Sequence, residues 1–236
     1  MVEEILHFKN LGHPVNTLIH VGAHEAEELE VYACKYKVKN ILLMEPNPDK
    51  YSIINSKIQK ISAKTDSNIV FYPIAAGSKT GKDTLTSFQG RSSGLASILK
   101  PKVRLIRETF GRDSLELSCN GGGVDQPTFQ HTIYISSLEK VVERHQEFQS
   151  ADLLVVDTQG YELEVLKGFK KFLRYIKSID LEVTVNAEIA FYEKNPSESE
   201  CRKLLNNYGF VPDPDNYHFW GPALHGKMLY RNNQIS

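Results

Sequence analysis

The sequence has few cysteines, and none of them are spaced as pairs. Its three cysteines, Cys34, Cys119 and Cys201, are odd in number, lie far apart and never form a CxxC motif. This pattern argues against both a disulfide framework and a zinc cluster. We therefore expect a reducing compartment and a cytoplasmic location.

Long apolar runs and an excess of one charge are also absent. No window approaches the ~18 apolar residues of a membrane span, and the N-terminus MVEEILHFKN lacks the basic and apolar regions of a signal peptide. Lysine and arginine number 28 against 29 aspartates and glutamates, so the net charge of −1 gives no long-range field to attract nucleic acid. We expect neither a membrane span nor a nucleic-acid partner, and nothing in the sequence predicts an oligomeric state.

The chain does contain short apolar runs that alternate with amphipathic stretches. At 236 residues and 41% hydrophobic, it fits one large α/β domain over residues 1–236. The alternation predicts βαβ units in a doubly wound sheet with helices on both faces. The expected strands are 17–21, 41–45, 69–76, 132–136, 153–157, 178–185 and 227–231, and the expected helices are 26–36, 49–63, 138–147, 160–175 and 198–208.

The periodicity fades over about 77–131, a segment that contains the Gly- and Ser-rich stretches FQGRSSGLAS and SCNGGGVDQPTF. It reads as a loop-rich insertion, in which LKPKVRLIRETF could form one short helix. A segment this long is either a functional lid beside the strand ends or a disordered surface insertion. The sequence leaves both open.

In a doubly wound sheet, ligands bind outside the carboxyl ends of the strands. Four expected strands end in residues suited to a cofactor pocket. These residues are His20, Gly22, Ala23 and His24 after the first strand, Glu45, Pro46 and Asn47 after the second, Ala75 and Ala76 after the third, and Asp157, Thr158 and Gln159 after the central one.

Glu45 follows Gly22 by 23 residues and can accept hydrogen bonds from both hydroxyls of a ribose. A dinucleotide is disfavoured, because this turn has one glycine rather than GxGxxG and four glutamates crowd the helix start. Those glutamates are Glu25, Glu27, Glu28 and Glu30. A ribosylated, cationic cofactor without phosphates, S-adenosylmethionine, fits these features better than NAD.

These stretches resemble the FkbM family of S-adenosylmethionine-dependent methyltransferases. IHVGAHEAEE is similar to its first motif, MEPNP to its second, and VVDTQGYELEVLKG to its D-x-x-G-x-E signature, while LNNYGF and FWGPALHGKMLY resemble its C-terminal half. The family commonly has Asp where this chain has His20, and a second glycine where it has Ala26. The resemblance implies a Rossmann-like class I methyltransferase sheet with an antiparallel last strand, and methyl transfer to a hydroxyl, often of a sugar or polyketide.

For the acceptor side, Asp157 is the expected catalytic base, because it ends the central strand and burial could raise its pKa. The alternative is that it only caps the following helix. Gln159, Asn186 and His225 are expected substrate contacts. No metal is expected, since His20 and His24 straddle a strand end and do not share a helix face.

The function expected from the sequence is S-adenosylmethionine-dependent O-methylation of a small molecule or glycan. The alternative is a catalytically inactive cofactor- or glycan-binding protein on the same fold, motivated by His20 and Ala26. A nicotinamide oxidoreductase is a third possibility.

Overall fold

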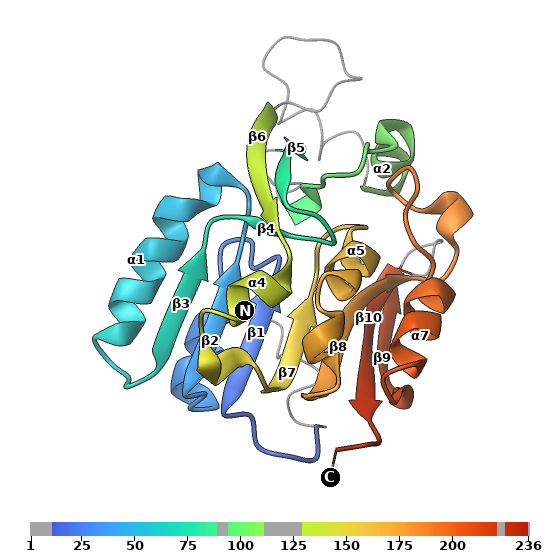
Figure 1. The fold of residues 1–236 in the computed structure, drawn as a ribbon. Helices are drawn as coiled ribbons and strands as arrows, with labels where there is room; N and C mark the ends of the chain where they lie inside the picture. The colour runs from blue at the N-terminus through green and yellow to red at the C-terminus, as the bar shows by residue number, and fades with distance from the viewer. Residues whose placement is uncertain (1–10, 89–93, 111–128, 221–224, 236) are drawn as a thin grey trace.

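The computed structural model describes residues 11–88, 94–110, 129–220 and 225–235. Its main element is a seven-stranded sheet of order β3-β2-β1-β7-β8-β10-β9 (Figure 1). All neighbours pair in parallel except β10, which is antiparallel to both β8 and β9. The expected doubly wound sheet with an antiparallel last strand is thus confirmed. The strands are β1 (Thr17–Val21), β2 (Asn40–Met44), β3 (Asn68–Tyr72), β7 (Ala151–Val156), β8 (Ile176–Thr184), β9 (Phe210–Trp220) and β10 (His225–Asn232).

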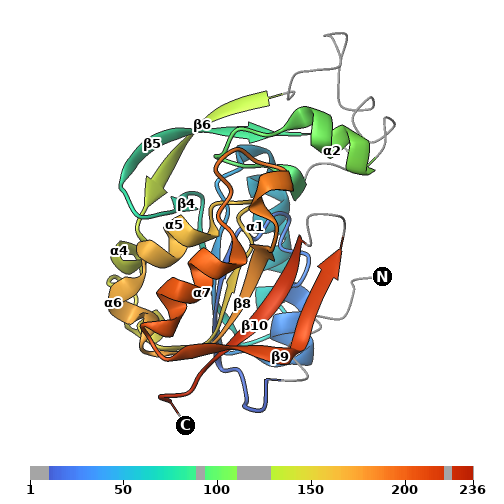
Figure 2. The ribbon, with the colours of Figure 1, turned by 90° about the vertical axis from the view of Figure 1, so that its right-hand side faces the viewer.

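Helical segments cover both faces of the sheet (Figure 2). They are η2 (Val31–Lys35), η3 (Pro48–Lys50), α1 (Tyr51–Ser62), α2 (Val103–Phe110), α4 (Leu138–Val142), η5 (Gln146–Phe148), α5 (Glu162–Lys167), α6 (Lys170–Leu173), η6 (Ala187–Ile189) and α7 (Glu198–Asn206). Ile19 and Val156 pack against α4 to α7 on one face, while Leu18 and Val155 pack against η2 and α1 on the other. Because the central strands are buried on both faces, they read in sequence as continuous apolar runs.

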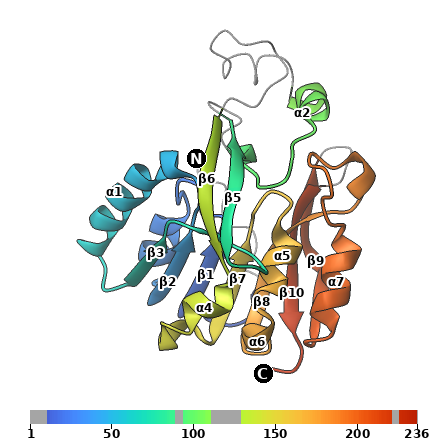
Figure 3. The same cartoon turned by 45° about the horizontal axis from the view of Figure 1, so that its top comes forward.

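A second sheet, of order β4-β6-β5, lies above the carboxyl ends of the main strands (Figures 1 and 3). Its strands are β4 (Ala75–Ala76), β5 (Gly81–Ser87) and β6 (Phe129–Ser136). The expected third strand, 69–76, is therefore wrong at its end, because the main-sheet strand stops at Tyr72. Ala75 and Ala76 pair instead with Ile135 and Ser136 of β6.

The expected insertion at 77–131 holds more regular structure than its composition suggested. It begins with β5, and α2 confirms the short helix expected in LKPKVRLIRETF. Between them, Ser97 pairs with Thr86 and Pro101 pairs with Tyr192. The reading of a disordered surface insertion is wrong for these described parts, while residues 89–93 and 111–128 lie outside the described residues.

Two expected helices differ from their predicted ranges because of the local backbone. The 26–36 segment becomes helical only from Leu29, because Ala26 has φ of 52°, outside the helical region, and still belongs to the turn. The 160–175 segment divides into α5 and α6 because Gly168 and Phe169, with ψ of 6° and 12°, leave the helical region.

No described helix is both long enough and apolar enough to span a membrane.

Candidate active site

The turn after β1 lies at the centre of the carboxyl edge, between the ends of β2 and β7. The N–H groups of Gly22 and Ala23 donate to the Met44 carbonyl at 2.9 and 3.0 Å, and the Asp157 N–H donates to Val21 at 3.0 Å. Gly22 has φ of 86°, and a Cβ there would lie 1.7 Å from the Asp157 carbonyl oxygen. The backbone of Asp157 therefore requires glycine at this position.

The same turn contains two further residues in the left-handed region, His24 and Ala26. Glycine adopts this conformation without strain, whereas other residues lose about 1 kcal/mol or more. The second glycine that the resemblance led us to expect would fall at Ala26, so the backbone explains why glycine suits that position. Ala26 keeps the same path and buries its methyl group, with 2% of the residue exposed.

Glu45, directly after β2, is a buried carboxyl group with 6% of the residue exposed. Oε2 accepts from the His24 N–H at 2.8 Å, and Oε1 accepts from the Asn47 N–H at 2.8 Å. Burial raises its pKa to about 7, although both backbone donors favour the charged form. Each oxygen keeps a further lone pair, so the carboxylate can still accept hydroxyl donors such as those of a ribose.

The neighbouring expected cofactor residues have structural partners of their own. Asn47 is 2% exposed, and its side chain accepts from the Asp49 N–H at 3.1 Å. The Pro46 carbonyl accepts from the Tyr51 hydroxyl at 2.9 Å. His24 contacts Glu27 through Nδ1 at 2.6 Å. Ala23 is buried, and Ala75 and Ala76 are buried beside β6 rather than at a main-strand end.

His20 is buried in β1, with Nδ1 3.4 Å from the Tyr32 hydroxyl. Burial lowers its pKa, opposed by Glu28. A neutral imidazole in this position is polar but not charged. His20 is therefore a buried, neutral side chain of β1 that contacts Tyr32.

Asp157, directly after β7, has both carboxylate oxygens engaged by side chains. Lys227 Nζ lies 3.1 Å from Oδ2, and Gln159 Nε2 donates to Oδ1 at 2.9 Å. Its side chain is 24% exposed and that of Lys227 is 31% exposed, so both reach the protein surface at the carboxyl edge of the sheet. Lys227 was not predicted from the sequence as a site residue, because it is separated from Asp157 by 70 residues and reaches it only through the pairing of β10 with β8.

The expectation that burial raises the pKa of Asp157 is wrong. Burial does act in that direction, but the charge of Lys227 and hydrogen bonds with Glu182, Gln159 and Lys227 outweigh it and hold this pKa below its usual value. Burial acts to lower the pKa of Lys227, yet the carboxylates of Asp157, Asp180 and Glu182 hold it above its usual value. Asp157 and Lys227 therefore form an ion pair at neutral pH.

The alternative role for Asp157, as a helix cap, is not seen, because the N-cap of α5 is Tyr161 and it has no side-chain cap hydrogen bond, while Glu162 binds the turn before the helix. Glu162 Oε1 accepts from the N–H and hydroxyl of Thr158 at 2.9 and 3.1 Å, and from the Gly160 N–H at 3.0 Å. Burial raises the pKa of Glu162 to about 7 against these hydrogen bonds. The D-x-x-G-x-E motif thus combines a crevice carboxylate with a second glutamate that folds back onto the turn.

Of the three expected substrate contacts, Gln159 is the one that hydrogen-bonds to Asp157 within the described part of the chain. Asn186 is exposed, and its side chain caps η6 by accepting from the Glu188 N–H at 3.2 Å. His225 is 6% exposed, stacks on Phe191 and contacts the Thr184 hydroxyl through Nδ1 at 2.8 Å. Burial lowers its pKa to about 4, so it is neutral at neutral pH, and its Nε2 has no hydrogen-bond partner among the described residues.

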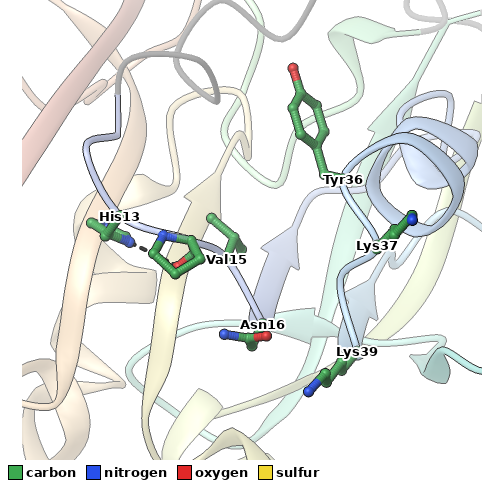
Figure 4. Close-up of a pocket in the computed structure, with 7 residues that line it drawn as sticks. His13, Val15, Asn16, Tyr36, Lys37 and Lys39 are labelled. Atoms are coloured by element: carbon green, nitrogen blue, oxygen red, sulfur yellow. Dashed lines mark hydrogen bonds between the residues drawn. The ribbon is translucent and has the colours of Figure 1, made fainter.

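A cavity of about 380 Å³ lies at the opposite end of the sheet, where β1 and β2 begin (Figure 4). It is lined by His13, Pro14, Val15, Asn16, Tyr36, Lys37 and Lys39. Because ligands of this fold bind at the carboxyl ends of the strands, this cavity is separate from the candidate site. Among the described residues, no group of three or more His, Cys, Asp or Glu side chains is arranged to hold a metal ion.

Solved structures support the fold described above. The chain is similar to Sp1610 of Streptococcus pneumoniae, described as a candidate tRNA (m1A22) methyltransferase, with 9% identity, a TM-score of 0.50 and coverage of 100% of this chain and 72% of that one. It is equally similar to a protein of the NADB-Rossmann superfamily from Streptococcus agalactiae, with 10% identity, a TM-score of 0.50 and coverage of 100% and 71%. Identities this low establish a Rossmann-like fold and nothing beyond it.

Family membership is established by sequence. The model of the methyltransferase FkbM domain matches residues 20–212, which include the turn after β1, Glu45, Asp157 and Glu162. No curated protein matches the sequence. The chain belongs to the FkbM methyltransferase family, and it is an S-adenosylmethionine-dependent methyltransferase, as its motifs predicted.

Proposed function

We propose that this methyltransferase transfers the methyl group to a hydroxyl of a small molecule or glycan, with Asp157 as the group that orients the acceptor and takes its proton. The observation that carries the proposal is the ionised Asp157 carboxylate, which is 24% exposed at the end of β7. It stands at the carboxyl edge on one side of the β1 turn, with Glu45 on the other.

The residues present fit the cofactor. Glu45 offers a carboxylate with spare lone pairs to the ribose, and the turn around Glu25 and Glu27 offers no favourable place for a pyrophosphate. The negative charges of Asp157 and Glu28 raise the pKa of His20 against the effect of burial, so they are felt at this edge of the sheet. The same charges favour a positive sulfonium there. S-adenosylmethionine, when bound, supplies an activated methyl group.

Asp157 suits the acceptor side for a chemical reason. Methyl transfer to an oxygen is an in-line displacement, so the protein must hold the acceptor oxygen about 3 Å from the methyl carbon and remove its proton. Gln159 and Lys227 hold the Asp157 carboxylate from two directions. A hydroxyl that donates to Asp157 would therefore be oriented by a group whose own position is fixed.

A calorimetric titration with S-adenosylmethionine, S-adenosylhomocysteine and NAD tests the cofactor side. We expect binding of both adenosyl ligands and none of NAD. Hydroxylated acceptors, sugars first, are then screened for methyl transfer, with tRNA and amines in the same screen. Transfer only to tRNA or an amine would overturn the proposal, and binding without transfer to any acceptor would support the inactive binding protein instead.

A substitution separates the role of Asp157 from cofactor binding. Asp157→Asn keeps the size and one acceptor oxygen but cannot take a proton, so turnover should fall by about 10²-fold or more. The affinity for S-adenosylhomocysteine should stay within about threefold. Wild-type turnover in this variant would exclude Asp157 as the proton acceptor.

The balanced net charge supports a small-molecule or glycan acceptor over a polyanion. The odd number and wide spacing of the cysteines support the proposal of a cytoplasmic location, which localisation of the tagged full-length protein would test.

A further inference from the structure

A second carboxyl group lies beside Asp157 and is absent from the residues singled out in the sequence. Leu181 of β8 pairs with Val156 of β7, so Glu182 lies next to Asp157. Glu182 also pairs directly with Lys227 of β10. Asp157, Glu182 and Lys227 therefore form a row across three neighbouring strands at the carboxyl edge of the sheet.

Gln159 joins the two carboxyl groups. Its Nε2 donates to Asp157 Oδ1 at 2.9 Å and contacts Glu182 Oε2 and Oε1 at 2.9 and 3.1 Å. Its Oε1 lies 3.2 Å from the Tyr192 hydroxyl, whose proton the Leu95 carbonyl also accepts at 2.9 Å. The ionised Asp157 carboxylate can only accept, and this sets the amide with its nitrogen towards the carboxyl groups. Both N–H bonds are thus used within the protein, so Gln159 is better suited to position Asp157 than to contact a substrate.

The backbone of Gln159 is held as firmly as its side chain. The residue adopts φ of 54°, and its carbonyl accepts from the Ser97 hydroxyl at 2.7 Å. Ser97 belongs to the insertion between β3 and α4, which pairs with Tyr192 through Pro101. The described part of the insertion therefore holds the backbone of Gln159 in place through Ser97.

If both carboxyl groups were ionised, the row would contain two negative charges and one positive charge, that of Lys227. Two carboxylates that share one amide donor repel each other, and one proton relieves that repulsion. Lys227 contacts Oδ2 of Asp157 at 3.1 Å, so the negative charge is best placed on Asp157. The proton then belongs to Glu182, which can donate it to Asp157.

We propose that Glu182 is protonated at neutral pH, shares that proton with Asp157, and acts with Gln159 and Lys227 as a positioning residue that fixes the ionised Asp157 carboxylate. The part of this inference that concerns catalysis rests on the proposed function. The shared proton itself does not.

The electrostatic surroundings agree with this assignment. Burial, followed by the charges of Asp157 and Glu162, raises the pKa of Glu182 well above its usual value. The titratable and charged groups that face the row come from β1, the turn after β1, η2, α5, β8, β10 and the segment after η6. They are Glu28, Tyr32, His20, Glu162, Asp180, Lys227 and Tyr192.

The pH dependence of stability tests the shared proton. A group whose pKa is raised by folding contributes stability below its unfolded value of about 4.5 and loses it as pH rises through the folded value. Glu182→Gln keeps a hydrogen-bond donor to Asp157 but cannot ionise, so the variant does not lose this stability as pH rises. Its Tm relative to the wild type should therefore rise between pH 5 and pH 9, by about 3 °C or more.

The comparison is a difference, so Glu45, which titrates in both proteins, cancels, whereas Glu162 acts directly on Glu182 and belongs to the titration that is measured. The control is Glu143→Gln, an exposed glutamate paired with Lys171, for which the Tm difference should not change with pH. A flat or falling difference for Glu182→Gln would mean that Glu182 is already ionised in the wild type, and would overturn the proposal.

A second experiment tests the positioning role once an acceptor is found. Glu182→Gln should keep kcat within about threefold, because it preserves the donor, whereas Glu182→Ala should lower kcat by about tenfold with the KM for S-adenosylmethionine unchanged. Equal losses in both variants would contradict positioning by a donated hydrogen bond. Absence of methyl transfer alongside the rising Tm difference would reject the proposed function while the shared proton stands.

Discussion

Removal of the Glu45 carboxylate is the sharpest test of the cofactor pocket. Hydrogen bonds to a charged group contribute about 1.5–3 kcal/mol, so Glu45→Ala should weaken binding of S-adenosylmethionine about 10- to 150-fold. Calorimetric titration at pH 8, where the wild-type carboxyl is mostly ionised, gives the largest contrast. Glu143→Ala, an exposed carboxylate that pairs with Lys171, is the control and should bind normally.

The stability of the same variant should change in a pH-dependent way. Ala at position 45 removes the oxygens that accept from the N–H groups of His24 and Asn47, which destabilises by about 1–3 kcal/mol for each lost hydrogen bond. A pKa raised from 4.5 to about 7 corresponds to about 3 kcal/mol of lost stability above pH 7 in the wild type, which the variant no longer suffers.

Because stability from a raised pKa is present below the unfolded value and lost as pH rises through the folded value, the deficit of Glu45→Ala should be larger at pH 5 than at pH 8. Urea unfolding at the two pH values measures it. Wild-type affinity for S-adenosylmethionine in this variant would refute the pocket, whatever its stability.

Three further substitutions test how the site is built. Gly22→Ala should destabilise by at least ~3 kcal/mol in urea unfolding, because the added Cβ meets the Asp157 carbonyl at 1.7 Å and the residue has φ of 86°; a loss below ~1 kcal/mol would contradict this packing. Ser97→Ala removes the 2.7 Å hydrogen bond to the Gln159 carbonyl and should lower Tm by about 2–4 °C, and an unchanged Tm would show that the insertion does not support the turn. Phe169→Ala, at a fully buried position, should cost about 3–5 kcal/mol without altering the affinity for S-adenosylhomocysteine per folded molecule.

The central sheet could be predicted from sequence because its strands are buried on both faces. β1 occupies the expected range 17–21, and β7 differs from its expected range by one or two residues at each end. Two strands were missed for physical reasons. β9 contains Pro212 and Pro214 and reads as a loop, yet it lies at the sheet edge, where proline is tolerated. β5, GKDTLTS, is polar and largely exposed in its first half, so no apolar pattern marks it.

The candidate site was predictable only where its residues lie at strand ends in the local sequence. Glu45 and Asp157 follow apolar runs directly, so position alone identified them. Glu182 and Lys227 lie inside strands and meet Asp157 through the order β7-β8-β10, which requires knowing that β10 inserts between β8 and β9. A sequence reading that paired β10 antiparallel with β8 at a set register would have found Lys227, but the register is decided by packing over the whole strand.

The pKa of Asp157 is lowered, whereas the sequence led us to expect that it is raised, and this changes the view of its chemistry. A strong base would be needed if the acceptor had to become an alkoxide before attack, and Lys227 would then be harmful because it stabilises the charged carboxylate. Attack by a neutral hydroxyl instead yields a protonated ether, which is far more acidic than a carboxylic acid, so even a carboxylate of low pKa accepts its proton downhill. What the reaction then requires of Asp157 is that it be ionised and correctly oriented at neutral pH. The contacts from Lys227, Gln159 and Glu182 provide for both, which is why a lowered pKa at this position supports a role in methyl transfer.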